Sequence, residues 1–261
     1  MMNDNLVRIR VWGDFACFTR PEMKVERVSY PIMTPSAARG VLEAIFWKPE
    51  MYYIIDSITA IRRGKWTAFK RNEIKKKTSL SNAKKWMTGK EEVKTIEAGG
   101  GTDDATPRNM LALCDVEYVI AAEIRLSKLG INSEQTVRKF SEEIMRRARL
   151  GKCFHRPGLG VREFDAHFEP AGENSYTGAG DWNEDLGLML YDVFDPAERS
   201  AGFKFLSDQA NQGAGRKPKV NFEGRLCRPK PIFFRARVVE SRLDCHPDRV
   251  ELVSQTEEGG E

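Results

Sequence analysis

The reactive side chains of this sequence are basic and aromatic rather than metal-binding. The chain has only three histidines, with no HExxH pattern and no close histidine–carboxylate cluster, so neither a metal nor a cofactor is expected. Residues 158–160 carry only GLG, which is a weak phosphate motif, and neither a Walker loop nor a GxSxG elbow occurs. Metal-independent RNA cleavage stays available, because its nucleophile is the ribose 2′-OH of the substrate itself. The protein needs only to align that group, move protons and stabilise charge on the phosphorane.

Lys139, His155 and Arg162 are the candidates for such a reaction. A lysine or arginine can stabilise the phosphorane charge, and a histidine can transfer protons. Each candidate also has a structural alternative. Lys139 could be one more solvated cation, His155 a phosphate or core contact, and Arg162 a partner in an ion pair. Taken singly, each residue favours its structural alternative.

The five cysteines are scattered and never form a CxxC pair, which is typical of reduced thiols rather than of a disulfide framework or a zinc site. No apolar run approaches the roughly 20 residues that a membrane helix needs. The N-terminus enters a strand-like pattern without the apolar core of a signal peptide. These features predict a cytoplasmic protein with no membrane contact.

Positive charge is concentrated in one segment. Residues 62–90 hold eleven lysines and arginines, Lys70 and Arg71 among them, and one acid, Glu73, within a chain of net charge +4. Trp66 and Trp86 are interleaved with these cations and offer surfaces on which bases could stack. The pattern favours contact with nucleic acid over its alternative, a solvated basic loop.

A first helix is predicted from Thr34 to residue 48. Thr34 is a suitable N-cap, Pro35 suits the first helical position, and Pro49 ends the helix. By its angle around the helix, Phe46 is expected on the flank of the apolar stripe and Trp47 well off it.

A second helix is predicted from about residue 132 to Gly151, with Val137, Phe140, Ile144 and Ala148 as its apolar stripe. Its other face is basic, and a basic, glycine-containing loop over residues 151–164 follows it.

Strands are predicted over residues 6–12, 51–61, 114–126, 186–193 and 232–240 from their alternation and their β-branched and aromatic content. The order strand–helix–strand, strand–helix–strand predicts an α+β protein with a ferredoxin-like arrangement, the fold of RRM domains.

Four blocks of sequence resemble one known family. Residues 10–49 resemble the N-terminal signature of the CRISPR-associated RAMP-fold protein of type I-C systems. MRRARLGK at residues 145–152, LGVREF at 159–164 and DLGLMLYD at 185–192 match it in the same order.

The resemblance implies a ferredoxin-like RAMP domain over residues 1–195, with a basic insertion at about 62–101. A smaller β-rich part over residues 196–245 and a disordered tail over 246–261 are expected to follow. Family members are subunits of the crRNA-guided surveillance complex (Cascade), and they hold the 5′ handle of the crRNA. In type I-C systems they also cut the pre-crRNA repeat hairpin without a metal, leaving a cyclic phosphate. The implied partners are therefore crRNA and pre-crRNA, the large and backbone subunits of Cascade, and target DNA through the complex.

The family's cutting site is usually a tyrosine near the end of the first helix and a Lys–His pair in the second. These positions correspond here to Phe46, Lys139 and Phe140. Because phenylalanine cannot move a proton, only the electrostatic group is retained, and cutting should be slow unless another group substitutes. His155, in the adjacent basic loop, is the nearest replacement in sequence.

Two hypotheses follow from the resemblance. In the first, the subunit binds the handle and cuts the repeat through Lys139 with His155 or another surrogate; in the second, it is a catalytically silent handle-binding scaffold. A general RRM-like RNA-binding protein outside CRISPR is a third hypothesis, against which the match of residues 10–49 argues. The expected RNA-binding residues are Arg39, Trp47, Lys48, Lys70, Arg71, Arg138, Arg146, Arg149, Lys152, Arg156 and Arg162.

Overall fold

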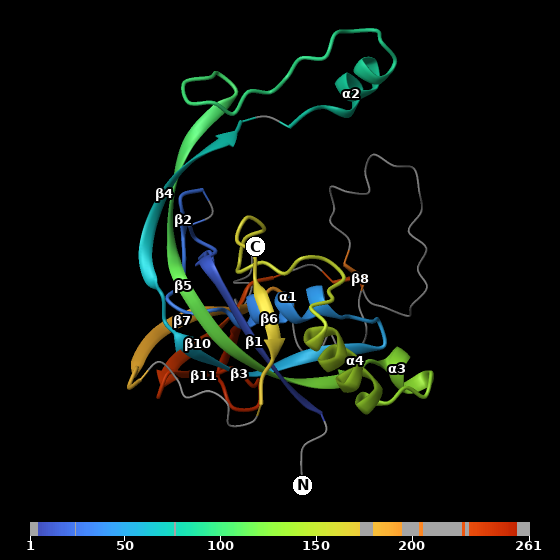
Figure 1. Ribbon diagram of the computed structural model, residues 1–261, viewed down its shortest axis with the longest axis vertical. Helices are drawn as coiled ribbons and strands as arrows, with labels where there is room; N and C mark the ends of the chain where they lie inside the picture. Colours follow the sequence, from blue (N-terminus) through green and yellow to red (C-terminus); the bar gives the residue numbers. More distant parts are fainter. Residues whose placement is uncertain are drawn as a thin grey trace, which may run out of the picture.

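A large, mostly antiparallel sheet forms the centre of the protein. The computed structural model describes residues 5–23, 25–75, 77–172, 180–194, 204–205, 226–227 and 230–254. The strands are β1 (Leu6–Ala16), β2 (Arg27–Val28), β3 (Met51–Arg62), β4 (Lys65–Ile74), β5 (Ala105–Leu126), β6 (His167–Pro170), β7 (Glu184–Asp192), β8 (Lys204–Phe205), β9 (Leu226–Cys227), β10 (Ile232–Val239), β11 (Arg242–Asp244) and β12 (Leu252–Ser254). Within the described residues ten strands share one sheet, along the path β12-β10-β11-β3-β5-β1-β6 (Figure 1). β2 and β4 pair with β5, β7 pairs with β10, and β8 pairs with β9 apart from this sheet.

β5 is the strand on which the sheet is built, because it pairs with β1, β2, β3 and β4 along its 22 residues. β1 lies antiparallel to it, in a register that runs from Leu6 opposite Glu123 to Ala16 opposite Leu113. The alternation of β1 decides which side faces the core: its valines and isoleucine are buried, and its arginines are partly exposed. The predicted strands at residues 6–12, 51–61, 114–126, 186–193 and 232–240 are confirmed, and β5 begins nine residues earlier than expected.

Helices α1 (Pro35–Ile45) and α4 (Val137–Arg149) lie beside the sheet, together with the short α3 (Lys128–Asn132) (Figure 1). Thr34 caps α1 as predicted, since its hydroxyl accepts a hydrogen bond from the backbone of Ala37 at 3.2 Å. The helix ends at Ile45, three residues before the predicted end, because Phe46 is extended with φ −157°. Phe46 is also buried rather than on the flank of the helix.

The sequence predicted one helix from about residue 132 to Gly151, and the predicted start is wrong. The chain forms α3, then a turn in which Glu134 has φ +51°, and then α4. The predicted apolar stripe is confirmed, since Phe140, Ile144 and Ala148 are buried and Val137 packs against the core.

The basic segment is folded rather than a loop. β4 pairs with residues 105–114 of β5 over its whole length, and this two-stranded ribbon extends away from the rest of the molecule (Figure 1). Helix α2 (Leu80–Met87) lies at its far end and has no buried residue. Exposure alternates along β4, with Trp66 and Lys70 on the more exposed face and Phe69 and Arg71 on the other.

The C-terminal strands extend the main sheet. β10 pairs with β7, and β11 pairs with β3, so residues from the β-rich part expected over 196–245 lie in the same sheet as the N-terminal strands. Residues 196–203, 206–225 and 228–229 of that region lie outside the described residues. Within the tail expected over 246–261, His246 is buried and residues 252–254 form β12, while residues 255–261 are not described.

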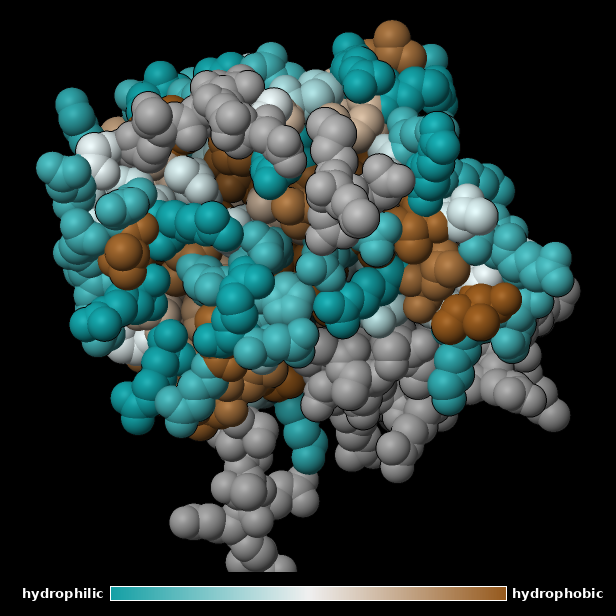
Figure 2. Space-filling model, turned by 90° about the horizontal axis from the view of Figure 1, so that it is seen from below, coloured by the Kyte–Doolittle hydropathy of each residue, from teal (hydrophilic) through white to brown (hydrophobic). Residues whose placement is uncertain are grey.

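Among the helices described, none combines the length and the apolar character needed to span a bilayer. Figure 2 shows one face of the molecule, on which hydrophobic side chains are visible in separate groups between hydrophilic ones.

Tyr118 of β5 offers a test of the core. Its side chain is fully buried, its ring packs edge-on against Phe18, and its hydroxyl has no hydrogen-bond partner among the described residues. Burial also raises the pKa of this phenol. Because an unpaired buried hydroxyl costs about 1–3 kcal/mol, we expect Tyr118→Phe to raise the free energy of unfolding, measured in urea, by about 1 kcal/mol. Tyr118→Leu, which removes the ring as well, should destabilise, and a loss of stability in Tyr118→Phe would contradict this account of the core.

Candidate functional site at the end of helix α1

The site is organised by the last carbonyl groups of α1. A helix leaves its final carbonyls without partners inside the helix, so other groups must satisfy them. The carbonyl of Ala44 accepts two backbone hydrogen bonds, from Phe154 at 2.8 Å and from His155 at 3.2 Å. The loop after α4 is therefore fixed to the end of α1 by its own backbone.

The next two carbonyls are satisfied by different elements. Ile45 accepts from the guanidinium of Arg147 on α4 at 3.4 Å, and Phe46 accepts from the hydroxyl of Tyr53 on β3 at 2.7 Å. Burial raises the pKa of the Tyr53 phenol well above its ordinary value, so this hydroxyl keeps its proton and donates it to Phe46. The loop after α4, α4 itself and β3 thus meet at one helix end.

Gly151 directs the chain from α4 back to α1. It has φ +61°, its N–H bonds to the carbonyl of Ala148, and the N–H of Lys152 bonds to the carbonyl of Arg147 at 2.9 Å. This pair of hydrogen bonds is the Schellman motif, in which a glycine at the left-handed position ends a helix. The motif starts the short turn after which the backbone of His155 bonds to Ala44.

The two family positions occupied by phenylalanine lie together in this site. The ring centroids of Phe46 and Phe140 are 6.2 Å apart, and both side chains are buried. The guanidinium of Arg147 lies over the Phe46 ring at 5.2 Å from its centroid. Lys139 is exposed at the edge of the pair, with its ammonium 5.9 Å from the Phe140 centroid and 2.8 Å from the side-chain oxygen of Gln135.

The backbone of His155 is therefore fixed to the end of α1 by its hydrogen bond to Ala44. Lys139 lies beside the Phe140 ring, which packs on Phe46. His155 is exposed, and one of its ring nitrogens lies 3.3 Å from the carbonyl oxygen of Arg156.

Most of the predicted RNA-binding cations belong to the segments that meet at this site, which are the end of α1, helix α4 and the loop after it. Lys48, Arg149 and Lys152 are exposed and have no carboxylate partner among the described residues. Trp47, directly after α1, has 51% of its side chain exposed. Arg138, Arg146 and Arg156 are paired with Glu142, Glu143 and Asp165, respectively. Surface pairs of this kind contribute about 0–1 kcal/mol, so a phosphate can replace the carboxylate at little cost.

Glu143 is the main acid of this face of α4. Hydrogen bonds from Arg146 and then Arg147 lower the pKa of Glu143 to about 2, so the carboxylate stays charged near neutral pH. It holds Arg147 at 2.8 Å, beside the Phe46 ring.

Three predicted RNA-binding residues lie elsewhere. Lys70 is exposed on β4, and Arg71 on the opposite face of that strand pairs with Glu73 and Glu163. Arg162 is exposed in the loop that packs against the end of β1. In that loop the GLG glycines allow close backbone packing, since a Cβ on Gly160 would collide with the carbonyl oxygen of Cys17.

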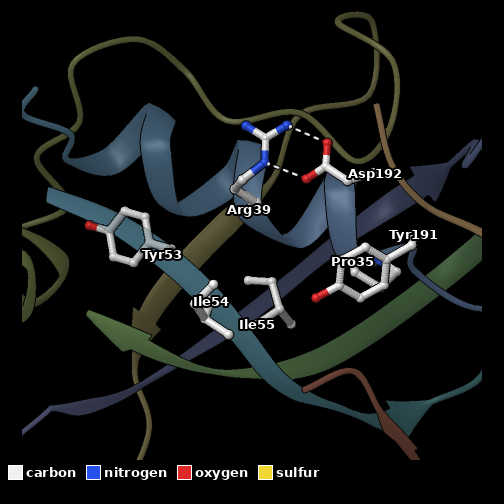
Figure 3. Close-up of a pocket in the computed structure, with 7 residues that line it drawn as sticks. All are labelled: Pro35, Arg39, Tyr53, Ile54, Ile55, Tyr191 and Asp192. Atoms are coloured by element: carbon white, nitrogen blue, oxygen red, sulfur yellow. Dashed lines mark hydrogen bonds and ion pairs between the residues drawn. The ribbon is translucent and has the colours of Figure 1, made fainter. Parts of the chain in front are cut away.

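Arg39 is bound to carboxylates inside the fold. Figure 3 shows its guanidinium directed at Asp192 of β7, with hydrogen bonds of 2.9 and 3.1 Å, and Glu43 accepts a third at 2.6 Å. Burial lowers the pKa of Arg39, but the carboxylates of Asp192 and Glu43 outweigh it and raise that pKa above the ordinary value. The geometry is that of a structural link between α1 and β7.

Sequence reasoning missed Tyr53, Arg147 and Phe154. Two of them had a signal in the sequence, because Arg147 belongs to the MRRARLGK block and Phe154 lies within a basic loop. Nothing in the sequence indicated that Tyr53 bonds to the end of α1. Within the described residues there is no group of three or more histidine, cysteine or acidic side chains that could hold a metal ion.

Comparison with known proteins agrees with the motif blocks. A family model described as CRISPR-associated protein (Cas_Cas5) matches residues 6–218, which places the chain among the CRISPR-associated proteins. A protein of Mannheimia succiniciproducens named CRISPR pre-crRNA endoribonuclease Cas5d is 43% identical over 198 residues, covering 72% of this chain and 85% of that protein. A protein of the same name from Thermus thermophilus is 36% identical over 256 residues, covering 97% of this chain and 96% of that protein. The chain belongs to the Cas5d family, and the resemblance seen in the sequence is confirmed.

Solved structures support the fold alone. The structure titled "Crystal Structure of CRISPR-associated Protein" has a TM-score of 0.58 and 18% identity, covering 94% of this chain and 96% of that one. A functionally uncharacterized protein, SMU1763c from Streptococcus mutans, has a TM-score of 0.57 and 16% identity, covering 95% of this chain and 97% of that one.

The link between Arg39 and Asp192 predicts a large loss of stability when one partner is removed. Breaking a buried ion pair from one side costs about 3–5 kcal/mol, but Glu43 stays bonded to Arg39, so Asp192→Asn should lower the free energy of unfolding in urea by about 2 kcal/mol. The double variant Arg39→Met/Asp192→Leu should recover most of the loss, because neither charge is then left buried alone. Asp181→Asn, at an exposed acid, is the matched control. Equal stability of Asp192→Asn and this control would contradict the structural assignment of Arg39.

Proposed function

We propose that this chain is an RNA-binding subunit of a type I-C CRISPR surveillance complex that holds the crRNA 5′ handle and cleaves pre-crRNA repeats. The proposal is supported by the two relatives named CRISPR pre-crRNA endoribonuclease Cas5d, one of which is aligned over 97% of this chain. The observation that carries it is the packing of Phe46 on Phe140, the family's proton-transfer positions, with Lys139 beside the Phe140 ring and the backbone of His155 bonded to Ala44.

The proposed domain is ferredoxin-like. Its strands are β1, β3, β5 and β6, its helices are α1 and α4, and the neighbouring strands lie antiparallel in the order β3-β5-β1-β6. This is the sheet order that the split βαβ arrangement requires. We propose the ribbon of β4 and β5 as the basic insertion of this domain and residues 196–245 as the β-rich part that follows it.

The proposed reaction is attack of a ribose 2′-oxygen on the adjacent phosphorus. A bond from the 2′-oxygen to phosphorus forms, the bond from phosphorus to the 5′-oxygen breaks, and a cyclic phosphate and a 5′-hydroxyl remain. His155 accepts the proton of the 2′-OH or returns one to the leaving 5′-oxygen, and the Lys139 ammonium stabilises the charge on the phosphorane. The buried Phe46 and Phe140 rings transfer no proton. The Lys139 ammonium lies near the Phe140 ring, and the Arg147 guanidinium lies over the Phe46 ring.

RNA binding is proposed for the cations around the helix end, with Trp47 as an exposed aromatic surface. The cations proposed to bind RNA at this site are Lys48, Arg138, Arg146, Arg149, Lys152 and Arg156. Lys70, Arg71 and Arg162 are proposed as contacts farther along the RNA. The proposed partners are crRNA, the pre-crRNA repeat hairpin, the large and backbone subunits of Cascade, and target DNA through the complex, in the cytoplasm.

A silent scaffold is the second candidate function. The observation that favours it is that both proton-transfer positions are buried phenylalanines. In that case the same surface holds the handle and another nuclease cuts the repeat.

Cleavage of the cognate repeat hairpin by the purified chain in excess EDTA tests the activity. We expect Lys139→Ala to lower the single-turnover rate by about 10²–10³-fold, by analogy with loss of one charge-stabilising donor. His155→Ala should lower it by about 10²–10⁴-fold, which is the usual contribution of a general acid–base group. The matched control is Arg237→Ala, at an exposed cation of β10. Tight binding with uncut RNA in the unmodified chain would favour the scaffold.

Salt dependence tests the RNA surface separately from cutting. If Lys48, Lys139, Arg149 and Lys152 each neutralise one phosphate, the affinity for an uncleavable 2′-deoxy repeat should fall about 50-fold between 50 and 200 mM salt. Lys152→Ala should reduce the slope of log affinity against log salt by about 0.7, and Arg237→Ala should leave it unchanged. An affinity that does not vary with salt would contradict both candidate functions.

A further inference from the structure

We infer that Phe154 is a stacking platform for one base of the bound RNA and thereby selects the nucleotide presented to His155. Phe154 is 83% exposed, although a phenylalanine is normally among the most buried residue types. This inference rests on the proposed function, which it extends from binding and cutting to the choice of cut site.

The loop that carries Phe154 is anchored rather than loose. The backbone N–H of Phe154 donates a hydrogen bond to the carbonyl of Ala44 at 2.8 Å, and the N–H of His155 donates to the same oxygen. The rings of Phe154 and His155 lie edge to face, with centroids 5.9 Å apart. A base stacked on Phe154 would therefore have a fixed position relative to the imidazole, and a fixed position is what in-line attack by a neighbouring 2′-OH requires.

The surroundings of Phe154 are cationic. Lys152 and Arg156 lie two residues on either side of it, and Arg149 ends the helix from which the loop leaves. The only acid bonded to this group among the described residues is Asp165, which pairs with Arg156. An exposed aromatic ring among cations is the combination that binds single-stranded nucleic acid, whereas protein-binding surfaces have few lysines at their centre.

A repeat RNA with 2-aminopurine scanned through it, and a 2′-deoxy nucleotide at the cut, reports stacking without cleavage. With the full chain we expect quenched fluorescence at one position next to the cut. Phe154→Ala should abolish that quenching and weaken binding by about 5- to 150-fold, which corresponds to the usual contribution of one stacked base. On cleavable RNA the same variant should spread the cut over neighbouring nucleotides.

The pattern across variants separates stacking from simple apolar contact. Phe154→Trp keeps an aromatic face and should keep the quenching and the single cut, whereas Phe154→Leu should behave as Phe154→Ala. Leu188→Ala, at an exposed apolar residue of β7, is the control for loss of surface area. Because the Phe154 ring is exposed, its variants should unfold at the same temperature as the unmodified chain.

Failure of this inference can be told apart from failure of the proposed function. If the unmodified chain cuts and Phe154→Ala changes neither quenching nor cut position, the stacking inference is overturned and the activity stands. If Phe154→Leu binds and cuts as the unmodified chain does, the ring is an apolar contact, such as a protein would use, and the inference is also overturned. If the unmodified chain leaves RNA uncut but quenching depends on Phe154, the activity fails and the stacking inference stands.

Discussion

The carbonyl end of helix α1 is the constraint on which the candidate site depends. Ala44, Ile45 and Phe46 present three carbonyl groups that the helix itself cannot satisfy, and a loop backbone, an arginine of α4 and a tyrosine of β3 satisfy them. Because the arginine is 102 positions along the chain from Ile45, forming the helix end also assembles the site. The negative end of the helix dipole favours the cation that lies there, so the arrangement is electrostatically consistent as well.

In this arrangement the residues that hold the helix end in place differ from those proposed to act on RNA. Phe46 and Phe140 form a buried aromatic pair, which fixes the position of the helix end but cannot exchange protons. Lys139 and His155, the groups proposed to act on RNA, lie outside that pair and are exposed. In the proposed site, proton transfer therefore depends on the loop after α4, which carries His155.

Local signals in the sequence predicted much of the fold. The start of α1 followed from Thr34 and Pro35, and the buried stripe of α4 followed from its period. The end of α1 could not be predicted, because the groups that cap its carbonyls are non-local. The same holds for Arg39, which is basic by sequence but is bound to Asp192, 153 positions away. β4 was not expected because both faces of the ribbon are largely polar, so it has no apolar alternation to read. For the site, the family resemblance indicated Lys139, Phe46 and Phe140, but only the structure bonded the backbones of Phe154 and His155 to Ala44 at the end of α1.

A structure of the full chain bound to an uncleavable repeat RNA, with a 2′-deoxy nucleotide at the cut, would test the central claim most directly. The account predicts that the scissile phosphate lies at the end of α1, in contact with Lys139 and next to His155. It would be contradicted by a scissile phosphate bound on the ribbon of β4 and β5, or anywhere else away from this helix end.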